Sequence, residues 1–402
     1  MKMHQRGAIP RGRRWLIGGA ALALATVVWL PLVHVFFTRP AAEFHAASGV
    51  SPKARELAAR HLQLWTDPAL RQRELDRMRA SNAEWDFMGR SFLVWSLANL
   101  GLRDPSAKAR HLDVIDRIIA ETLKLEAELG MHFFLMPYSK ARPYVVQPER
   151  SLFLEGEIAL MLASRRLLEE KAEYAKPLAE RIGRIEERLR SNPLLAMESY
   201  PDECWMFDHA LALAAVRLSD ALDGTDHSAL CRDWVGVARR KLIHRESGLL
   251  LSSFTLDGLA LDGPEGSTIW MVAHCLQLVD EAFARDQYER ARCELGRTLC
   301  GFGYACEWPA SWSGRMDIDS GPIIPGLNIS AGSSGMAFIG ACAFGDDAFV
   351  RSLAATLDFA AFPSRQEGRL RYCASNQVGD AALLYATVVG PLWERARTLG
   401  KR

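Results

Sequence analysis

The sequence has almost no net charge and lacks the short motifs that mark common cofactor and metal sites. Lys and Arg number 49 against 48 Asp and Glu, so the formal net charge is +1 at pH 7. This balance favours neither a nucleic-acid partner nor a strongly acidic substrate. HExxH, paired CxxC, a Walker loop, GxGxxG after a strand and GxSxG are all missing. The residues therefore predict no metal and no cofactor.

A disulfide framework is also missing, although the chain has eight cysteines. Most of them fall inside expected helices. Cys293 and Cys300 would lie two turns apart on one helix, about 10.5 Å by rise, which is too far for a bridge. Free buried thiols are expected for most of the cysteines.

Only one long apolar run is present, near the N-terminus. Residues 15–37 contain no Asp, Glu, Lys or Arg, and a helix of that length spans ~35 Å, enough for a hydrocarbon core of ~30 Å. Only Arg39 follows closely, whereas basic residues precede the run at Lys2, Arg6, Arg11, Arg13 and Arg14. A cleaved signal peptide is the alternative, but signal cores usually have ~7–15 residues.

The charge asymmetry gives an expected order along the chain. The positive-inside rule predicts a cytoplasmic basic tail at 1–14, a single-pass transmembrane anchor at 15–37, a linker at 38–50 and a periplasmic domain at 51–402. The inner membrane of a bacterium is the expected location.

Beyond the anchor, helical periodicity continues to the end of the chain. Helices are expected near 52–78, 84–101, 108–130, 150–170, 174–191, 204–222, 226–243, 267–281, 285–301, 331–344, 346–358 and 378–398. Amphipathic helices alternate with helices that are apolar nearly all round, and the latter must be buried on all sides. This alternation predicts an all-α (α/α)6 toroid of six helical hairpins, with an open solenoid as the alternative.

The loop lengths indicate where a site would lie. Connections that lead into the buried helices are long, for example 131–149, 244–266 and 302–330, and all of them would emerge at one end of the ring. Residues 248–254 are expected to form one strand of a short β-hairpin on that rim. Helix N-termini at the same end would contribute free N–H groups and positive partial charge.

Acidic and aromatic residues gather at the expected starts of the buried helices and in the longest loop. Carboxylates in an apolar cavity have shifted pKa values, so a pair can divide acid and base roles. The catalytic candidates are Asp208, Glu157, Asp202 and Glu203. The substrate-binding candidates are Trp85, Asp86, Tyr200, Trp205, His209, Glu265, Trp270, Glu307 and Asp319.

Each candidate also has a structural interpretation. Asp202 and Glu203 precede a helix and could serve only as its N-terminal cap and first-turn charge. His209 is more often a core histidine than a catalytic one, and the tryptophans could all be packing residues. Glu155 and Glu157 are two positions apart on one helix, so at most one of them is expected to face the cavity.

The middle of the chain resembles the linalool dehydratase/isomerase family. The similar segments are LEGEIALMLA (154–163), SNP (191–193), the Pro-Asp of YPDECWMFDHALAL (200–213), DALDGTDHSALCRDWV (220–235) and ESGLLLSSF (246–254). The resemblance covers about a third of the chain. It implies an (α,α)6 barrel in the bacterial periplasm that dehydrates or isomerises a terpene alcohol without a cofactor. It also implies homo-oligomeric rings.

The sequence departs from that family where its chemistry lies. The family's two active-site cysteines correspond to Ser199 and Asp208, and its active-site histidine corresponds to Glu157. Cys204 matches neither cysteine. The site is therefore more acidic than in the family, and carboxylates would replace the thiol pair.

Three functions follow as hypotheses. The first is acid/base cleavage or rearrangement of a C–O bond in a terpenoid-like alcohol. The second is a glycan hydrolase or lyase of the cell envelope on the same toroid, a fold analogy that gains chemical sense if two carboxylates face each other. The third is a non-catalytic toroid that binds a glycan or a protein.

Overall fold

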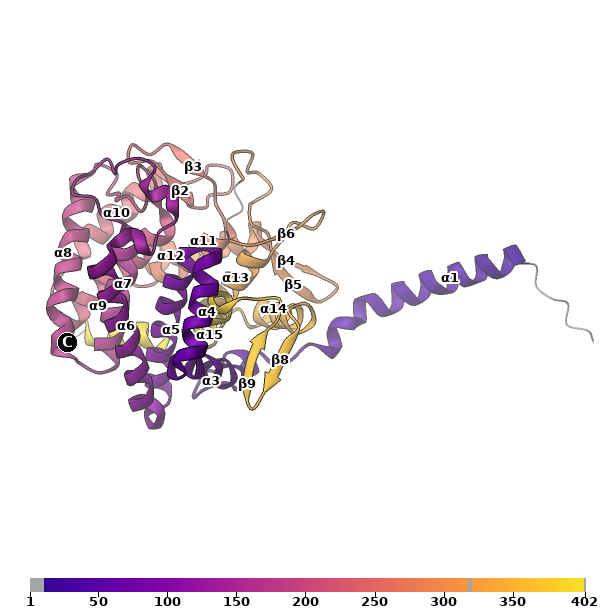
Figure 1. Cartoon of the computed structure of the whole chain (residues 1–402). Coiled ribbons are helices and arrows are strands. Elements are labelled where there is room, and N and C mark those ends of the chain that lie inside the picture. Colours follow the sequence, from indigo (N-terminus) through magenta and orange to yellow (C-terminus); the bar gives the residue numbers. More distant parts are fainter. Residues whose placement is uncertain (1–10, 317–319, 401–402) are drawn as a thin grey trace, which may run out of the picture.

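The computed structural model describes residues 11–316 and 320–400, most of which are helical (Figure 1). Each helix that was expected to be apolar on all sides is buried along most of its length. These inner helices are α5 (Ala83–Arg103), α7 (Leu152–Leu168), α9 (Met206–Asp223), α11 (Gly266–Leu276), α13 (Ala331–Phe344) and α15 (Gln377–Val388).

The inner helices close into a ring. Each packs on the next in chain order, and α15 returns to pack on α5. The amphipathic helices lie outside them: α3 (Pro52–Thr66), α4 (Pro68–Ser81), α6 (Lys108–Leu129), α8 (Ala175–Ser191), α10 (Ser228–Lys241), α12 (Glu281–Glu294) and α14 (Asp347–Ala360). The expected (α/α)6 toroid is therefore confirmed for the described part of the chain, and the open solenoid is excluded.

Three expected helices end at least seven residues earlier than the periodicity predicted. The first, at 52–78, is split because Asp67 leaves the helical conformation and caps α4, accepting hydrogen bonds from the N–H groups of Ala69 and Leu70, both at 3.0 Å. The last is split at Gly390, whose φ of 118° suits glycine. The piece that follows, α16 (Pro391–Leu399), lies across α5, α7 and α9.

The third shortened helix is followed by a hairpin instead. Beyond α12, the strands β4 (Gly296–Leu299) and β5 (Phe302–Ala305) pair antiparallel. The strands β7 (Ile329–Ser330) and β6 (Ile323–Ile324) continue this sheet, and β8 (Pro363–Gln366) pairs with β9 (Arg369–Tyr372). The loops that lead into α13 and α15 are thus more ordered than the sequence suggested.

The expected rim hairpin is present but shorter than predicted. Its strands are β2 (Ser253–Phe254) and β3 (Ala260–Asp262), and β1 (Cys204–Trp205) adds to them with Cys204 opposite Phe254. This sheet fixes the direction in which the chain enters α9, where the catalytic candidates lie.

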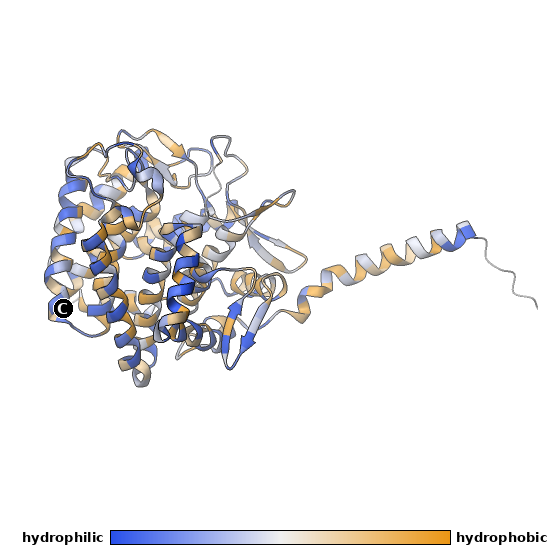
Figure 2. Cartoon of the chain, in the orientation of Figure 1, coloured by the Kyte–Doolittle hydropathy of each residue, from blue (hydrophilic) through white to orange (hydrophobic). Residues whose placement is uncertain are grey.

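The N-terminal helix stands away from the domain. Helix α1 (Arg11–Trp29) continues into the 3-10 helix η1 (Leu30–Phe36), and Figure 2 shows it as hydrophobic over most of its length. By length and composition, residues Arg11–Phe36 form a helix that could cross a membrane. The described chain thus carries one long apolar helix near its N-terminus, compatible with a signal anchor or a single-pass span.

All eight cysteines lie in the described ranges and are free thiols. Cys204, Cys231, Cys275 and Cys342 are buried, and burial raises the pKa of each of these thiols. They contribute packing rather than cross-links.

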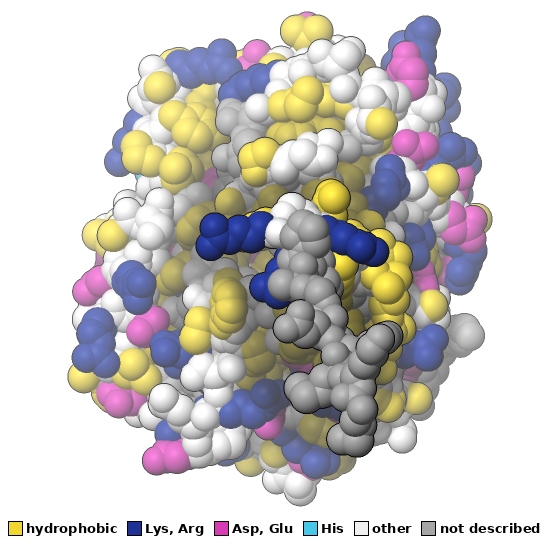
Figure 3. All heavy atoms as spheres, turned by 90° about the vertical axis from the view of Figure 1, so that its right-hand side faces the viewer, with side chains coloured by type: hydrophobic (Ala, Val, Ile, Leu, Met, Phe, Trp, Pro, Cys, Tyr) yellow, Lys and Arg dark blue, Asp and Glu magenta, His cyan; other side chains and the backbone are white. Residues whose placement is uncertain are grey.

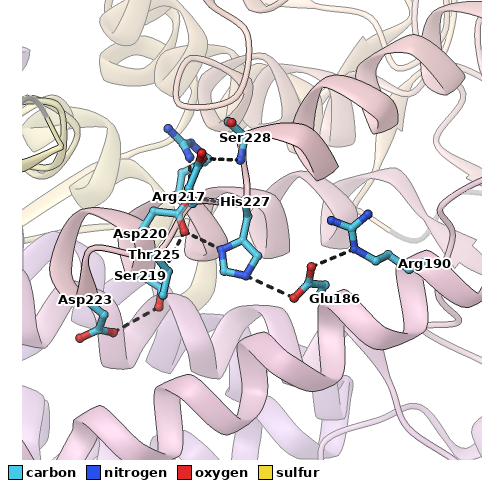
Figure 4. Close-up of polar contacts among 10 residues, drawn as sticks. Glu186, Arg190, Arg217, Ser219, Asp220, Asp223, Thr225, His227 and Ser228 are labelled. Atoms are coloured by element: carbon cyan, nitrogen blue, oxygen red, sulfur yellow. Dashed lines mark hydrogen bonds and ion pairs between the residues drawn. The ribbon is translucent and has the colours of Figure 1, made fainter.

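The turn between α9 and α10 is held by one buried carboxylate, Asp220 (Figure 4). It accepts hydrogen bonds from Thr225 Oγ1 at 2.8 Å and from the backbone N–H of His227 at 3.1 Å, and it contacts the His227 ring at 2.5 Å. His227 also reaches Glu186 on α8 at 3.3 Å. The segment DALDGTDH is therefore built to connect helices, and its residues do not line the cavity described below.

We expect Asp220→Ala to lower the free energy of unfolding by about 1–3 kcal/mol, because it leaves buried donors without their acceptor. Urea denaturation monitored by circular dichroism measures this change. The matched control is Asp233→Ala, an exposed position on the neighbouring helix, where the change should stay within about 0.5 kcal/mol. Equal effects of the two substitutions would contradict the structural role of Asp220.

Candidate active site

A cavity of about 970 Å³ opens at the end of the ring where the inner helices begin. This volume is near the upper end of the range typical of small-molecule sites. Its acidic lining residues are Glu84, Glu203, Asp208, Asp262 and Glu265, and Arg315 adds a positive charge. Aromatic and apolar side chains form most of the remaining wall, including Trp85, Phe92, Tyr138, Phe153, Tyr200, Trp205, Phe207 and Phe338.

Helix N-termini place several of these carboxylates. Asn82 caps α5, accepting a hydrogen bond from the N–H of Glu84 at 2.8 Å, and this sets Glu84 in the first turn. Asp208 lies in the first turn of α9, and Glu265 is the residue that precedes α11. The positive end of each helix dipole points toward the cavity and favours negative charge there.

The carboxyl group of Asp208 has a strongly raised pKa. Burial, with smaller contributions from the charges of Glu84 and Glu203, raises the pKa of this group to about 8 in spite of the opposing effect of the Ser199 side chain. Most Asp208 side chains are therefore protonated at pH 7. A protonated carboxyl group in an apolar cavity can donate a proton to a substrate oxygen.

Glu203 is the second acid, and it is held in place by the aromatic wall. Trp205 Nε1 donates a hydrogen bond to its Oε1 at 2.6 Å, and the Tyr138 hydroxyl donates to the same oxygen at 3.3 Å. The pKa of Glu203 is raised, because burial outweighs these two donors, which lower it. Hydrogen bonds to the charged form suit a base rather than an acid.

Tyr200 and Glu84 form a further hydrogen-bonded pair in the wall. The Tyr200 hydroxyl donates to Glu84 Oε1 and accepts from the backbone N–H of Met136 at 3.0 Å. Tyr138 stacks on Tyr200 with 4.4 Å between ring centroids. The loop before α7 is thus fastened to the loop before α9, and both tyrosines line the cavity.

Glu157 lies inside the ring but not in the cavity wall. It is completely buried, and burial, together with the charges of Asp208 and Glu84, raises its pKa well above the usual value, against a contact with Ser91. The fold therefore favours the protonated form of Glu157, and the charge of Asp208 contributes to this preference. The structure brings together the positions that the family resemblance singles out, Glu157, Ser199 and Asp208, although Glu157 and Ser199 do not line the cavity.

Three predicted binding residues have structural partners and do not line the cavity. Asp86 pairs with Arg90 at 2.9 Å and with Arg79 at 3.3 Å. Glu307 accepts a hydrogen bond from the N–H of Ser267 at 2.9 Å, which satisfies the start of α11. Trp270 is fully buried, and its Nε1 donates to Ser333 Oγ at 3.1 Å.

Two further candidates also lie outside the lining. The His209 ring bridges two backbone groups, with Nδ1 at 2.7 Å from the carbonyl oxygen of Trp205 and Nε2 accepting from the N–H of Met197 at 3.1 Å. This is the core histidine that was weighed as the alternative. Asp202 takes a turn conformation with a φ of 51°, and its carboxylate accepts from the N–H of Leu256 at 3.3 Å. Asp319 lies outside the described residues.

The cavity is also lined by Tyr138, Asp262 and Arg315, none of which the sequence pattern marked as a site residue. All three lie in the long loops that lead into inner helices. Asp262 accepts a hydrogen bond from Ser253 Oγ at 3.0 Å and lies 3.9 Å from Arg315. The available signal in the sequence was the length of these loops. It indicated that the segments are functional but did not identify residues within them.

Within residues 11–316 and 320–400, no group of three or more His, Cys, Asp or Glu side chains is placed to hold a metal ion. The acids of the cavity come from separate loops and helices, and two of them, Glu84 and Glu203, accept hydrogen bonds from aromatic side chains. The arrangement is suited to proton transfer by carboxyl groups.

No family model matches the sequence, and no curated protein matches it. Among solved structures, the chain is similar to a family 105 glycoside hydrolase from C. acetobutylicum (11% identity, 83% of this chain, 99% of that chain, TM-score 0.49). It is also similar to a family 76 α-1,6-mannanase of Salegentibacter sp., an inactive variant in complex with α-1,6-mannotriose (11% identity, 77% and 89% coverage, TM-score 0.46). A third is a family 76 α-mannanase from Bacteroides thetaiotaomicron (9% identity, 77% and 87% coverage, TM-score 0.42).

Proposed function

We propose that the protein is an enzyme that cleaves a C–O bond by general acid catalysis, with Asp208 as the acid and Glu203 as its partner. The observation that carries the proposal is the contrast between these two carboxyl groups in one cavity. Asp208 has a pKa of about 8 and is neutral at pH 7. Glu203 accepts hydrogen bonds from Trp205 and Tyr138 that favour its charged form. Two carboxyl groups in different surroundings can divide the roles of acid and base.

The first candidate reaction is hydrolysis of a glycosidic bond. Asp208 gives its proton to the leaving oxygen, and the C–O bond breaks. Glu203 takes a proton from a water molecule, whose oxygen forms the new bond to carbon. Asp208 ends the reaction ionised and Glu203 ends it protonated, and exchange with solvent restores both.

Hydroxylated substrates suit the polar end of the cavity. Carboxylates accept hydrogen bonds from hydroxyl groups, and Glu84, Glu203, Asp262 and Glu265 line that end. Trp85 and Trp205, in the same wall, offer the rigid apolar surface that aromatic side chains present to ring-shaped ligands. These residues support a glycan as the substrate class.

The second candidate is dehydration of a hydrophobic alcohol, and a specific observation favours it. Apolar side chains dominate the rest of the cavity, among them Phe92, Phe153 and Phe338. In this reaction Asp208 protonates the hydroxyl group, water leaves, and Glu203 removes a proton from the neighbouring carbon. This is the chemistry that the resemblance to linalool dehydratase/isomerase implies, carried by carboxyl groups in place of thiols.

The full chain in lipid nanodiscs should be incubated with mixed envelope oligosaccharides and, separately, with linalool and geraniol. New reducing ends with no change in the alcohols would support the glycosidase, and loss of water from an alcohol alone would support the dehydratase. Turnover that survives Asp208→Asn would contradict the assigned mechanism. A lack of turnover on both sets would favour a non-catalytic binding role.

We further propose that α1 is a retained anchor with its basic end in the cytoplasm, so that the catalytic domain faces the periplasm. Arg11, Arg13 and Arg14 lie at the outer end of the helix, away from the domain. We expect an added protease to leave the domain intact in whole cells and to digest it once the outer membrane is permeabilised. This result would contradict a cytoplasmic domain.

Glu203→Gln is expected to lower kcat by about 10²–10⁴-fold, the usual contribution of a general base. It should also shift the alkaline limb of the pH–rate profile to lower pH, because the Glu203 charge raises the pKa of Asp208. The profile should be measured from pH 5 to 9. Asp202→Asn is the matched control, since it changes a neighbouring acid that does not line the cavity, and it should leave the profile unchanged.

A further inference from the structure

Hydrophobic side chains are exposed on the face of the domain from which α1 emerges. We call this the anchor face and define it by the exposed residues Leu299, Leu327, Phe359 and Phe362. They come from the end of β4, the β6–β7 turn, the last turn of α14 and the segment that follows it, so separate parts of the chain contribute to one apolar surface. Figure 3 looks onto this side and shows hydrophobic side chains beside and behind the helix.

The backbone conformation of Phe362 adds an energetic cost to the exposure of its side chain. Its ring is 67% exposed, and its backbone has a φ of 51°, a region that bulky residues rarely adopt. Glycine or asparagine would relieve this strain and would not expose an aromatic ring to water. An exposed residue under strain indicates a role outside the packing of the domain.

The end of the apolar helix is seated on the same face. Phe37, which follows η1, packs on Phe359 with ring centroids 5.1 Å apart and on Phe302 at 6.4 Å. His34 lies 6.2 Å from the ring of Phe302. Residues up to Phe36 are apolar enough to lie in a membrane, so the membrane surface would meet the domain here.

The cavity reaches this face. Ile324, Leu357, Ala360 and Ala361 line it, and Ile324 and Ala360 are exposed beside Leu327 and Phe359 in the chain. The cavity therefore has two ends of different chemistry. The carboxylates of α5, α9 and α11 lie at one end, and the apolar side chains of α13, α14 and α15 lead from there to the anchor face.

We propose that the anchor face rests on the lipid bilayer and that the cavity admits a membrane amphiphile. Its hydrocarbon tail lies along α13–α15, and its hydroxylated head reaches Asp208. The assignment of the head rests on the proposed function, whereas the docking of the face does not. The occupant of the exposed surface is lipid, because the one apolar helix that could span a membrane in the described chain ends against it.

Docking can be measured without any turnover. The full chain, with the four cysteines that are not buried (Cys293, Cys300, Cys306 and Cys373) replaced by Ser, carries Phe362→Cys for labelling with the fluorophore NBD. Leu259→Cys is the matched control, because Leu259 is 66% exposed and lies near the β2–β3 turn, distant from α1 in Figure 1. Both proteins are reconstituted into phosphatidylcholine vesicles with and without nitroxide-labelled lipid.

The label at residue 362 should show a blue-shifted emission and at least twofold quenching by the nitroxide lipid, and the label at residue 259 should show neither. Equal quenching of the two labels, or none at residue 362, would overturn the docking. A protein without detectable activity would still give this result, so failure of the docking and failure of the proposed function are distinguishable.

The proposed position of the hydrocarbon tail in the cavity is tested with 1-dodecanol as the probe and 1-butanol as the short-chain control. Dodecanol should raise the Tm of the domain in the full chain by several degrees, and butanol should not. Ala360→Trp, which narrows the mouth of the cavity at an exposed position, should remove the dodecanol shift. A shift that persists in this variant, or that butanol reproduces, would overturn the proposed path.

Discussion

Asp208→Asn is expected to lower kcat by about 10²–10⁴-fold, because it removes the only proton that the proposed acid supplies while retaining the size and polarity of the side chain. The pKa of about 8 predicts that activity of the parent protein falls as pH rises through this value. The measurement is kcat against pH, on whichever substrate class the screen identifies.

The same substitution should not destabilise the domain. The folded pKa of Asp208 lies above the ordinary value, so the fold favours the protonated form. The stabilising contribution of that form is fully present below the unfolded pKa of about 4 and is lost as pH rises through about 8. Asn has no charge to bury, so at pH 9 the variant should be at least as stable as the parent. A large loss of stability would instead mark Asp208 as a structural residue.

Glu155→Ala is expected to destabilise the domain by about 3–5 kcal/mol, since removing one partner leaves buried charge uncompensated. The Glu155 carboxylate receives Arg181 at 2.8 Å, Arg184 at 2.9 Å and Arg150 at 3.3 Å, and both Glu155 and Arg181 are buried. Arg181 keeps Glu126 as a second partner, which limits the loss. Urea denaturation at pH 7 measures this change in the free energy of unfolding.

Glu157→Gln is the matched control, two residues away on the same helix. Burial raises the pKa of Glu157 but the arginines lower that of Glu155 in spite of its burial. The stabilisation from Glu155 is thus present above its unfolded pKa and lost as pH falls through its lower folded value, and Glu157→Gln should leave stability unchanged or raise it. Equal losses from the two substitutions would contradict this division.

Glu155 and Glu157 also show which properties the sequence predicted and which it did not. Their spacing established that they point in different directions, and the structure confirms it. Which of them would be charged depended on α8, whose arginines surround Glu155, and on α5 and α9, which enclose Glu157. These neighbours come from separate helices, and no local pattern records them.

The candidate site likewise has features that the sequence predicted and features that it did not. Acids and aromatic residues at the starts of inner helices were predicted to gather at one end, and Trp85, Tyr200, Glu203, Trp205, Asp208 and Glu265 do line the cavity there. Asp86, chosen by the same rule, and Glu307, chosen because it lies in the longest loop, are instead satisfied by nearby structural partners. A helix-start position predicts the end of the ring but not the direction of a side chain.

The alternation of fully apolar and amphipathic helices by itself favoured a closed ring over an open solenoid, because a helix that is apolar all round has to be enclosed, and a ring encloses it. The run at 15–37 likewise determined one long apolar helix that stands apart from the core. Only the tertiary structure decided that the cavity has an acidic and an apolar end and that the apolar end meets the face carrying this helix. Those properties arise where loops from distant parts of the chain converge, and their contacts are set by the closure of the ring rather than by neighbours in sequence.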